Sequence, residues 1–146
     1  VTDYAILSKE RGSIPMTCYP FWKHNSKNVL HIGTAGGWTK ASTGYTFRNA
    51  NKKSEALVQF LRHNDDLTQF HKKNRFWFYD LLLLDILSRT NHKGAAIFSS
   101  MFKNGKAAPI FKFLDEESSF TEDIRVISQC PKGLFIAALI RRIINL

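Results

Sequence analysis

The feature that most restricts how this chain can fold is a glycine-rich stretch within residues 29–47. A short apolar run, Val29-Leu30-His31-Ile32, stops at Gly33-Thr34-Ala35-Gly36-Gly37, and a further glycine, Gly44, precedes a long segment with helical spacing. The run has residues of strand type, whereas the clustered glycines allow backbone torsions and close approaches that a side chain would block. The pattern predicts a strand, a tight loop and a helix, in that order.

A connection of this kind can be purely structural or can bind a ligand. A helix that starts after Thr43 and Gly44 directs its free N–H groups and the positive end of its dipole back over the loop. That arrangement favours an electron-rich group such as a phosphate or an anionic ring. An ordinary strand-to-helix connection has the same glycine spacing, so both interpretations stay open on spacing alone.

The overall charge indicates anionic surroundings. The chain has 146 residues, enough for one domain with a core, and 21 Lys and Arg against 12 Asp and Glu give a net charge of +9. Nucleic acid, anionic lipid and a phosphorylated cofactor all fit that charge. The two cysteines, Cys18 and Cys130, lie far apart without a C-x-x-C pair, which argues against a zinc site or a disulfide framework and favours a reducing, cytoplasmic setting.

The rest of the pattern predicts a small extended portion at the front and a helical majority behind it. Extended pieces are expected at residues 3–7 and 13–17, where Pro15 indicates a sheet edge or a strand start. Helical spacing or capping signals mark the segments 47–63, 67–87, 95–102, 109–114, 119–127 and 134–144. The most apolar segment, 76–87, is not expected to span a membrane, because Asp80 and Asp85 interrupt it.

No constellation of catalytic or metal-ligating residues is present. The five histidines lack metal-ligand spacing, H-E-x-x-H and G-x-S-x-G are absent, and there is no local cysteine–histidine arrangement. Asp80 and Asp85 are roughly 140° apart around a helix, so they do not form an acid–base pair on one face, and a place on the helix surface is expected for both. Glu10 is expected to be an exposed residue paired with Lys9 or Arg11.

Cations and aromatic rings alternate in residues 70–79, FHKKNRFWFY. This composition suits single-stranded nucleic acid, through phosphate contacts and base stacking, and it suits an anionic membrane surface at least as well. No named nucleic-acid-binding motif is present. A buried helix with a solvated basic end has the same sequence, so three interpretations stay open.

Three short motifs lie before residue 46: Glu10-x-Gly12-x-Ile14-Pro15-Met16, Ile32-Gly33-Thr34-Ala35-Gly36 and Ser42-Thr43-Gly44-Tyr45. On these motifs the chain resembles the flavoprotein lycopene cyclases of bacteria and plants. Less specifically, residues 75–87 and the motif Phe120-Thr121-Glu122-Asp123 are similar to the carboxy-terminal part of that family. The resemblance covers nearly the whole chain.

The resemblance implies an α/β fragment, mostly α, that forms the carboxy-terminal part of a Rossmann-like FAD- and NAD(P)-binding flavoprotein. Residues 1–65 would belong to the FAD-binding domain, with a few strands, the flavin loop and a helix. Residues 66–146 would form a helical region that faces substrate and membrane. The chain begins at Val1 without an initiator methionine, and the dinucleotide fingerprint and the usual catalytic acid are expected upstream. No catalytic residue and no metal ligand is therefore assigned within the chain.

The family's flavin contacts carry over to the two glycine motifs. The loop would let the backbone approach the ring, and the second motif would begin the helix that faces the ring's carbonyl edge. The expected cofactor-binding residues are Gly33, Thr34, Ala35, Gly36, Gly37, Thr43, Gly44 and Tyr45. Many relatives have His-Pro before S-T-G-Y, whereas this chain has Lys40-Ala41 and a loop one residue longer, so the histidine's role is not assigned to Lys40.

The resemblance also implies a reaction. Reduced FAD, maintained by NAD(P)H, would act without net redox change while a terminal double bond of lycopene is protonated, the carbocation closes to an ionone ring and a proton is lost. The complete enzyme would be an isomerase, and the fragment alone inactive. Lycopene or a related carotenoid and the inner face of the membrane would be its partners, in a cytoplasmic, peripheral location without nucleic acid. Alternatives are another isoprenoid flavoprotein oxidoreductase and a basic module that binds membrane or nucleic acid.

Overall fold

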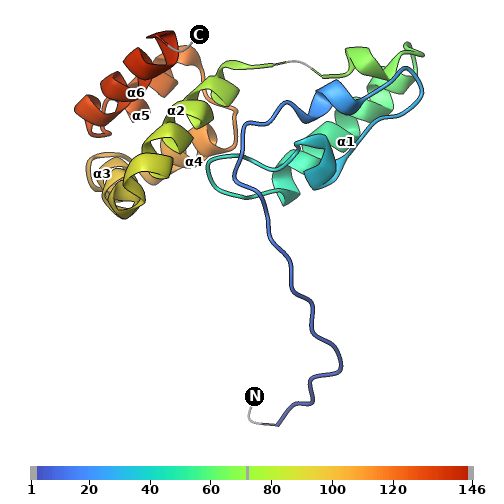
Figure 1. Ribbon diagram of the computed structural model, residues 1–146, viewed down its shortest axis with the longest axis horizontal. Helices are drawn as coiled ribbons and strands as arrows, with labels where there is room; N and C mark the ends of the chain where they lie inside the picture. The colour runs from blue at the N-terminus through green and yellow to red at the C-terminus, as the bar shows by residue number, and fades with distance from the viewer. Residues whose placement is uncertain (1–2, 72, 145–146) are drawn as a thin grey trace.

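A computed structural model describes residues 3–71 and 73–144, and regular structure there is almost entirely helical. Figure 1 shows α1 and the front loops on one side, α2 to α6 packed together on the other, and the segment that begins at residue 3 extending away from both. The elements are the short 3-10 turns η1 (Phe21–His24), η2 (Gly33–Gly36), η3 (Leu67–Gln69) and η4 (Asn91–Lys93), and the helices α1 (Phe47–Leu61), α2 (Arg75–Thr90), α3 (Gly94–Asn104), α4 (Ala107–Leu114), α5 (Phe120–Ile127) and α6 (Lys132–Ile144).

The prediction of a mostly α chain is confirmed, but the expected strands are absent from the described residues. The β pairing found there is an isolated bridge between Ser26 and Val29, which closes a tight turn. Residues 3–16 lie in no helix or strand and are exposed. A strand needs a neighbour for its N–H and C=O groups, and nothing in the described part of the chain supplies one. A Rossmann-like FAD-binding fold is therefore not shown, and the division at residues 65 and 66 stays a prediction.

The helices follow the local signals closely. Helix α1 ends within two residues of the expected position, α3 and α4 are separated at the predicted break, and α6 covers the predicted carboxy-terminal helix. Ser119 caps α5 in a complete capping box with Glu122. One prediction was wrong: segment 67–87 is not continuous, because Asp66 caps the short turn η3 and Asn74 starts α2 by accepting a hydrogen bond from the Trp77 N–H.

The core lies among the last five helices. Helix α2 is at its centre and packs most extensively against α6, while α3, α4 and α5 close the other sides. The buried apolar side chains of this core are Leu82, Ile86, Ile97, Met101, Ile110, Val126, Cys130 and Ala138. In the described residues, no helix has both the length and the apolar content to cross a membrane.

Ion pairs join the front portion to the helical portion. The acidic turn after α4 receives Arg48 from α1, which pairs with Asp115 and Glu117, and Lys52, whose ammonium lies 2.6 Å from Glu117. A third contact runs from Lys40, in the loop before α1, to Glu116. These contacts hold the glycine loop and α1 beside the start of α2.

Candidate functional site: an aromatic pocket beside an apolar groove

A cavity of about 270 Å³ lies between the front loops, the flank of α1 and the start of α2. Six large rings line its wall, and we call it the aromatic pocket. The rings are those of Tyr19, Phe21, Trp22, Trp38, Phe70 and Trp77. Polar and charged side chains share the wall with these rings, among them Lys40, Lys53, His71, Asp80 and Glu116.

The aromatic pocket gathers part of the predicted flavin site. Thr34, Gly36 and Gly37 line it. The other five expected residues, Gly33, Ala35, Thr43, Gly44 and Tyr45, do not line it, and the side of α1 that faces the cavity carries Asn49 and Lys53 instead. Cofactor binding by all eight residues stays a prediction.

The glycines of the loop are required by its own packing. A side chain at Gly36 would overlap the backbone carbonyl group of His31, and Gly37 has a left-handed φ of 68° with the Phe21 ring only 3.0 Å from an added Cβ. The loop therefore needs glycine at these two positions whether or not a ligand is bound. Glycine spacing is evidence for the loop's shape and not, by itself, for the cofactor.

Two buried polar atoms in the aromatic pocket have no hydrogen-bond partner among the described residues. They are Nε2 of His71, whose ring stacks on Trp22 at a centroid distance of 4.0 Å, and Nε1 of Trp77. Burial, helped by the charges of Lys53 and Lys73, lowers the pKa of His71 to about 4, so its imidazole is neutral at pH 7. The pocket thus offers one indole N–H donor and one neutral imidazole to a ligand.

A buried ion pair lies behind the rings. The Lys40 ammonium donates to both carboxylate oxygens of Asp80 at 2.9 Å and to Glu116 at 3.1 Å, and both Lys40 and Asp80 are almost fully buried. Burial raises the pKa of Asp80, although Lys40 acts in the opposite direction. The expectation that Asp80 and Asp85 lie on the helix surface was wrong, because each is buried against cations from other segments.

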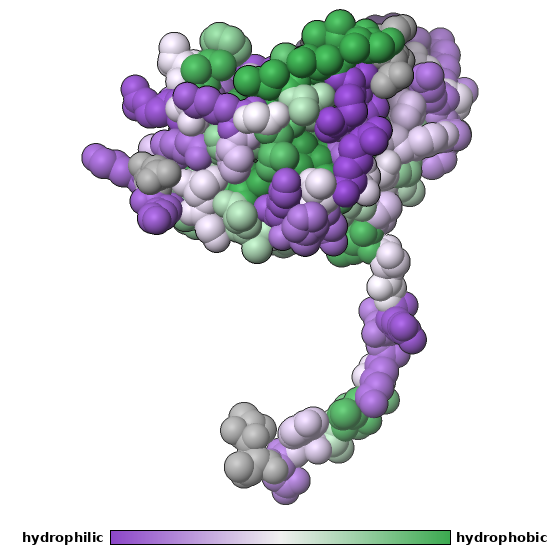
Figure 2. All heavy atoms as spheres, turned by 60° about the vertical axis from the view of Figure 1, so that its left-hand side comes forward, coloured by the Kyte–Doolittle hydropathy of each residue, from purple (hydrophilic) through white to green (hydrophobic). Residues whose placement is uncertain are grey.

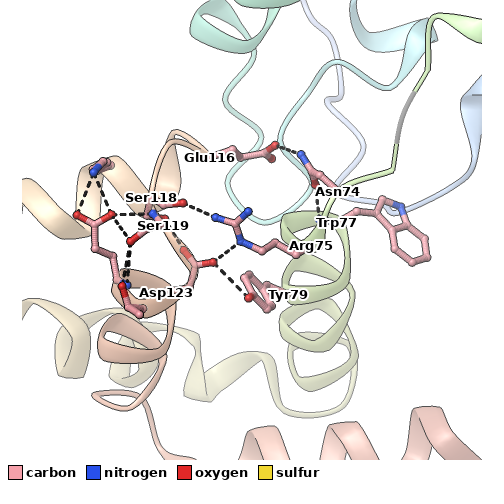
Figure 3. Close-up of polar contacts among 11 residues, drawn as sticks. Asn74, Arg75, Trp77, Tyr79, Glu116, Ser118, Ser119 and Asp123 are labelled. Atoms are coloured by element: carbon pink, nitrogen blue, oxygen red, sulfur yellow. Dashed lines mark hydrogen bonds and ion pairs between the residues drawn. The ribbon is translucent and has the colours of Figure 1, made fainter.

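A second network fixes Glu116 and the start of α2 (Figure 3). Asn74 donates to Glu116 at 2.8 Å, while Arg75 donates to the carboxylate of Asp123 and to the backbone carbonyl of Ser118. Glu116 has a left-handed φ of 61°, a conformation that costs a non-glycine residue about 1–2 kcal/mol. In this conformation the Glu116 carboxylate contacts both Lys40 and Asn74.

A second cavity of about 240 Å³, which we call the apolar groove, is enclosed by α2 to α6. Its wall is almost free of polar groups and includes Phe78, Phe98, Met101, Phe113, Phe135 and Leu139. Asp80 belongs to the walls of both the apolar groove and the aromatic pocket. Asp80 therefore lies where an apolar surface meets an aromatic one.

Sequence reasoning did not find the residues that organise this site. Lys40 and Asp80 are 40 positions apart, and His71 and Trp77 have no motif around them. Two signals were available: Asp80 and Asp85 interrupt an apolar segment, and Lys40 stands where relatives have histidine. Neither signal says which residues these side chains contact.

A mostly helical chain with an aromatic, carboxylate-containing pocket beside an apolar groove is suited to binding an apolar ligand. The family model described as lycopene cyclase protein matches residues 1–140. The chain therefore belongs to the lycopene cyclase family, as its motifs predicted, which indicates in broad terms an enzyme of carotenoid cyclisation. No curated protein and no solved structure matches the chain.

Proposed function

We propose that this chain forms part of a lycopene cyclase that converts the ψ-end of lycopene, or of a related carotenoid, to an ionone ring, and that the complete enzyme is an isomerase. One observation carries the proposal beyond family membership: the glycine-loop residues Thr34, Gly36 and Gly37 line a pocket that shares Asp80 with the apolar groove. A hydrocarbon chain held in the groove would have its end close to aromatic rings and carboxylates.

Such a reaction adds and removes one proton and no other atom. Protonation of the terminal double bond leaves a tertiary carbocation, attack by a neighbouring double bond closes the ring, and loss of a proton restores neutrality. The site must keep water away from the cation and present electron density to it. In this chain the rings of Trp38 and Phe70 would supply aromatic faces, and the carboxylates of Asp80 and Glu116 would supply negative charge. The acid that delivers the proton is not assigned to a residue of this chain.

The family implies FAD kept reduced by NAD(P)H, and the aromatic pocket fits a flavin ring in one respect. The unpartnered atoms of His71 and Trp77 match the hydrogen-bonding edge of such a ring, which carries donors and acceptors side by side. These two side chains and the backbone at Gly36 and Gly37 would hold the ring. When bound, reduced flavin supplies an electron-rich surface for the cation, and NAD(P)H supplies the reducing equivalents that maintain it.

The proposal includes a location. A long hydrocarbon is stored in a bilayer, and a net charge of +9 favours contact with anionic lipid. We therefore place the enzyme at the cytoplasmic, inner face of the membrane as a peripheral protein, with a carotenoid as substrate and no nucleic acid as partner.

Expression of the complete reading frame in a lycopene-accumulating host tests the function. Lycopene should be replaced by cyclic products without net NAD(P)H consumption, and the exposed variant Val58→Ala serves as the expression control. Unchanged lycopene would count against the proposal, and stoichiometric NAD(P)H consumption would indicate an isoprenoid reductase or monooxygenase. Trp77→Phe keeps a ring but removes the N–H, so it should weaken flavin binding measured by flavin fluorescence.

A further inference from the structure

Lys53, on α1, is a half-buried cation in the wall of the aromatic pocket. Its ammonium donates to the backbone carbonyl of Gly37 at 3.4 Å, which is a long hydrogen bond to a neutral group. Burial lowers the pKa of Lys53, and Glu116, which opposes this shift, acts on it from beyond ion-pair distance because its carboxylate pairs with Lys40. A cation in such a place is stabilised when an anion lies beside it.

The acids of the described residues do not supply that anion. Between residues 55 and 123 each acidic side chain contacts another side chain, and Asp80 and Glu116 are both held by Lys40. Asp3 and Glu10 remain, but residues 3–16 are exposed. Figure 2 shows the segment that begins at residue 3 leaving the body of the molecule. The anion that compensates Lys53 is therefore expected to be a ligand.

The charges in the wall of the aromatic pocket favour an occupant with one negative charge. Three lysines and two acids leave one positive charge in excess; they are Lys40, Lys53, Lys73, Asp80 and Glu116. His71 is neutral at pH 7, and its low pKa is due in part to the charge of Lys53. The other histidine of the wall, His31, has its Nδ1 atom 3.3 Å from Oδ1 of Asn25.

The rings beside Lys53 favour an occupant that is flat and has a polar edge. Trp22 and His71 stack at a centroid distance of 4.0 Å, and the unpartnered Nε2 of His71 and Nε1 of Trp77 belong to the same wall. A flavin ring has such a shape and such an edge. Its oxidised form is neutral, whereas its reduced form is either neutral or, with one proton fewer on that edge, singly negative.

We infer that Lys53 holds reduced flavin in its singly negative form, with the lysine ammonium compensating the charge of the ring's polar edge. The inference rests on the flavin binding proposed above. Reduction of FAD to this form takes up two electrons and one proton, which together are the hydride that NAD(P)H supplies, whereas neutral reduced FAD takes up a second proton. A matching positive charge favours the reduced cofactor over the oxidised one, so FAD stays in the state that the proposed reaction uses.

Redox titration of FAD bound to the protein of the complete reading frame tests the role of Lys53. Lys53→Met should weaken the binding of reduced FAD relative to oxidised FAD at least tenfold, which lowers the midpoint potential of the bound cofactor by about 30 mV or more. Proton uptake is measured at a pH where free FAD takes up two protons per two electrons. The wild type should take up one proton there and Lys53→Met two.

Two variants serve as controls. Lys53→Arg keeps the positive charge and should keep the uptake of one proton. Lys52→Met removes the neighbouring lysine of α1, whose ammonium already lies 2.6 Å from Glu117, and should change the relative affinity less than twofold. Urea denaturation without FAD checks folding: Lys53→Met should be no less stable than the wild type, because it removes a cation without an acidic partner among the described residues.

Four results would each overturn the inference: equal weakening of oxidised and reduced FAD in Lys53→Met, an unchanged potential in that variant, uptake of two protons by the wild type, or a complete protein that binds no FAD. Cyclisation is assayed separately. Absent cyclisation with the Lys53-dependent potential intact would reject the proposed reaction and leave the role of Lys53 standing. Cyclisation by a wild type whose potential does not depend on Lys53 would reject this inference alone.

Discussion

Replacement of Lys40 by methionine is expected to destabilise the protein strongly, because it leaves Asp80 buried without its cation. Lys40 is 5% exposed and Asp80 7% exposed, and the ammonium contacts both carboxylate oxygens at 2.9 Å. Removing one partner of a buried ion pair typically costs about 3–5 kcal/mol, against a total stability of roughly 5–15 kcal/mol for a small domain. Since Asp80 can take up a proton instead of staying charged, we expect the lower end, about 3 kcal/mol at pH 7.

The pH dependence follows from the same carboxyl group. Burial already raises the pKa of Asp80, and loss of Lys40 removes the attraction that opposes this shift. The folded variant then binds a proton at a pH where the unfolded chain does not, so its stability rises as pH falls from above the folded pKa toward the unfolded value near 3.8. The stability difference between wild type and Lys40→Met should therefore shrink between pH 7 and pH 4.

Urea denaturation followed by tryptophan fluorescence measures these differences, and Lys112→Met is the matched control. Lys112 contacts both oxygens of Glu122 at 2.9 Å, the same geometry as the Lys40 pair, but its side chain is 45% exposed. Loss of an exposed pair changes stability little. If the two variants unfold at the same urea concentration, or if acid does not narrow the gap for Lys40→Met, the assignment of Lys40 as the partner of a buried charge is wrong.

Three further predictions use the same denaturation assay. Gly36→Ala should lower the free energy of unfolding by more than about 2 kcal/mol, because the added Cβ overlaps the backbone of His31. In Gly33→Ala the added Cβ meets no atom within 4 Å, so the positive φ alone should cost about 1–2 kcal/mol. The reverse order of the two losses would contradict the loop geometry. Burial lowers the pKa of His71 in the folded protein to about 4, below the ordinary histidine value of 6.5. Wild-type stability should therefore fall on acidification between those two pH values, and His71→Phe should remove that slope. Ile97→Ala should cost about 3 kcal/mol, and a loss below about 1 kcal/mol would argue against its place in the core.

The helices could be predicted because their signals are local. Ser119 and Glu122, for example, form a capping box three residues apart. Interactions at this distance depend on the identity of nearby residues alone. Expected and observed helix ends therefore agree within a few residues for α1 and for α3 to α6.

The strands and the site depend on partners that local patterns do not specify. The run from Val29 has strand composition, but Val29 pairs with Ser26 in a turn and finds no neighbouring strand in the described residues. Asp80 was expected at the helix surface because it shares no helix face with Asp85, yet it is buried, and the lysine that compensates its burial lies 40 positions earlier. The motifs identified the family, whereas the contacts of Lys40 and Asp80 required the fold.

The fold also changes how the cation-rich segment 70–79 should be interpreted. Lys73 lies over the rings of Trp22 and Trp77 at the aromatic pocket, and Arg75 is held by Asp123. Because these cations and rings already contact one another or the acidic turn, they are poorly placed to bind phosphates and bases of a single strand. The acidic turn at residues 115–117 likewise pairs with Lys40, Arg48 and Lys52. These contacts agree with the interpretation of this segment as the start of a buried helix.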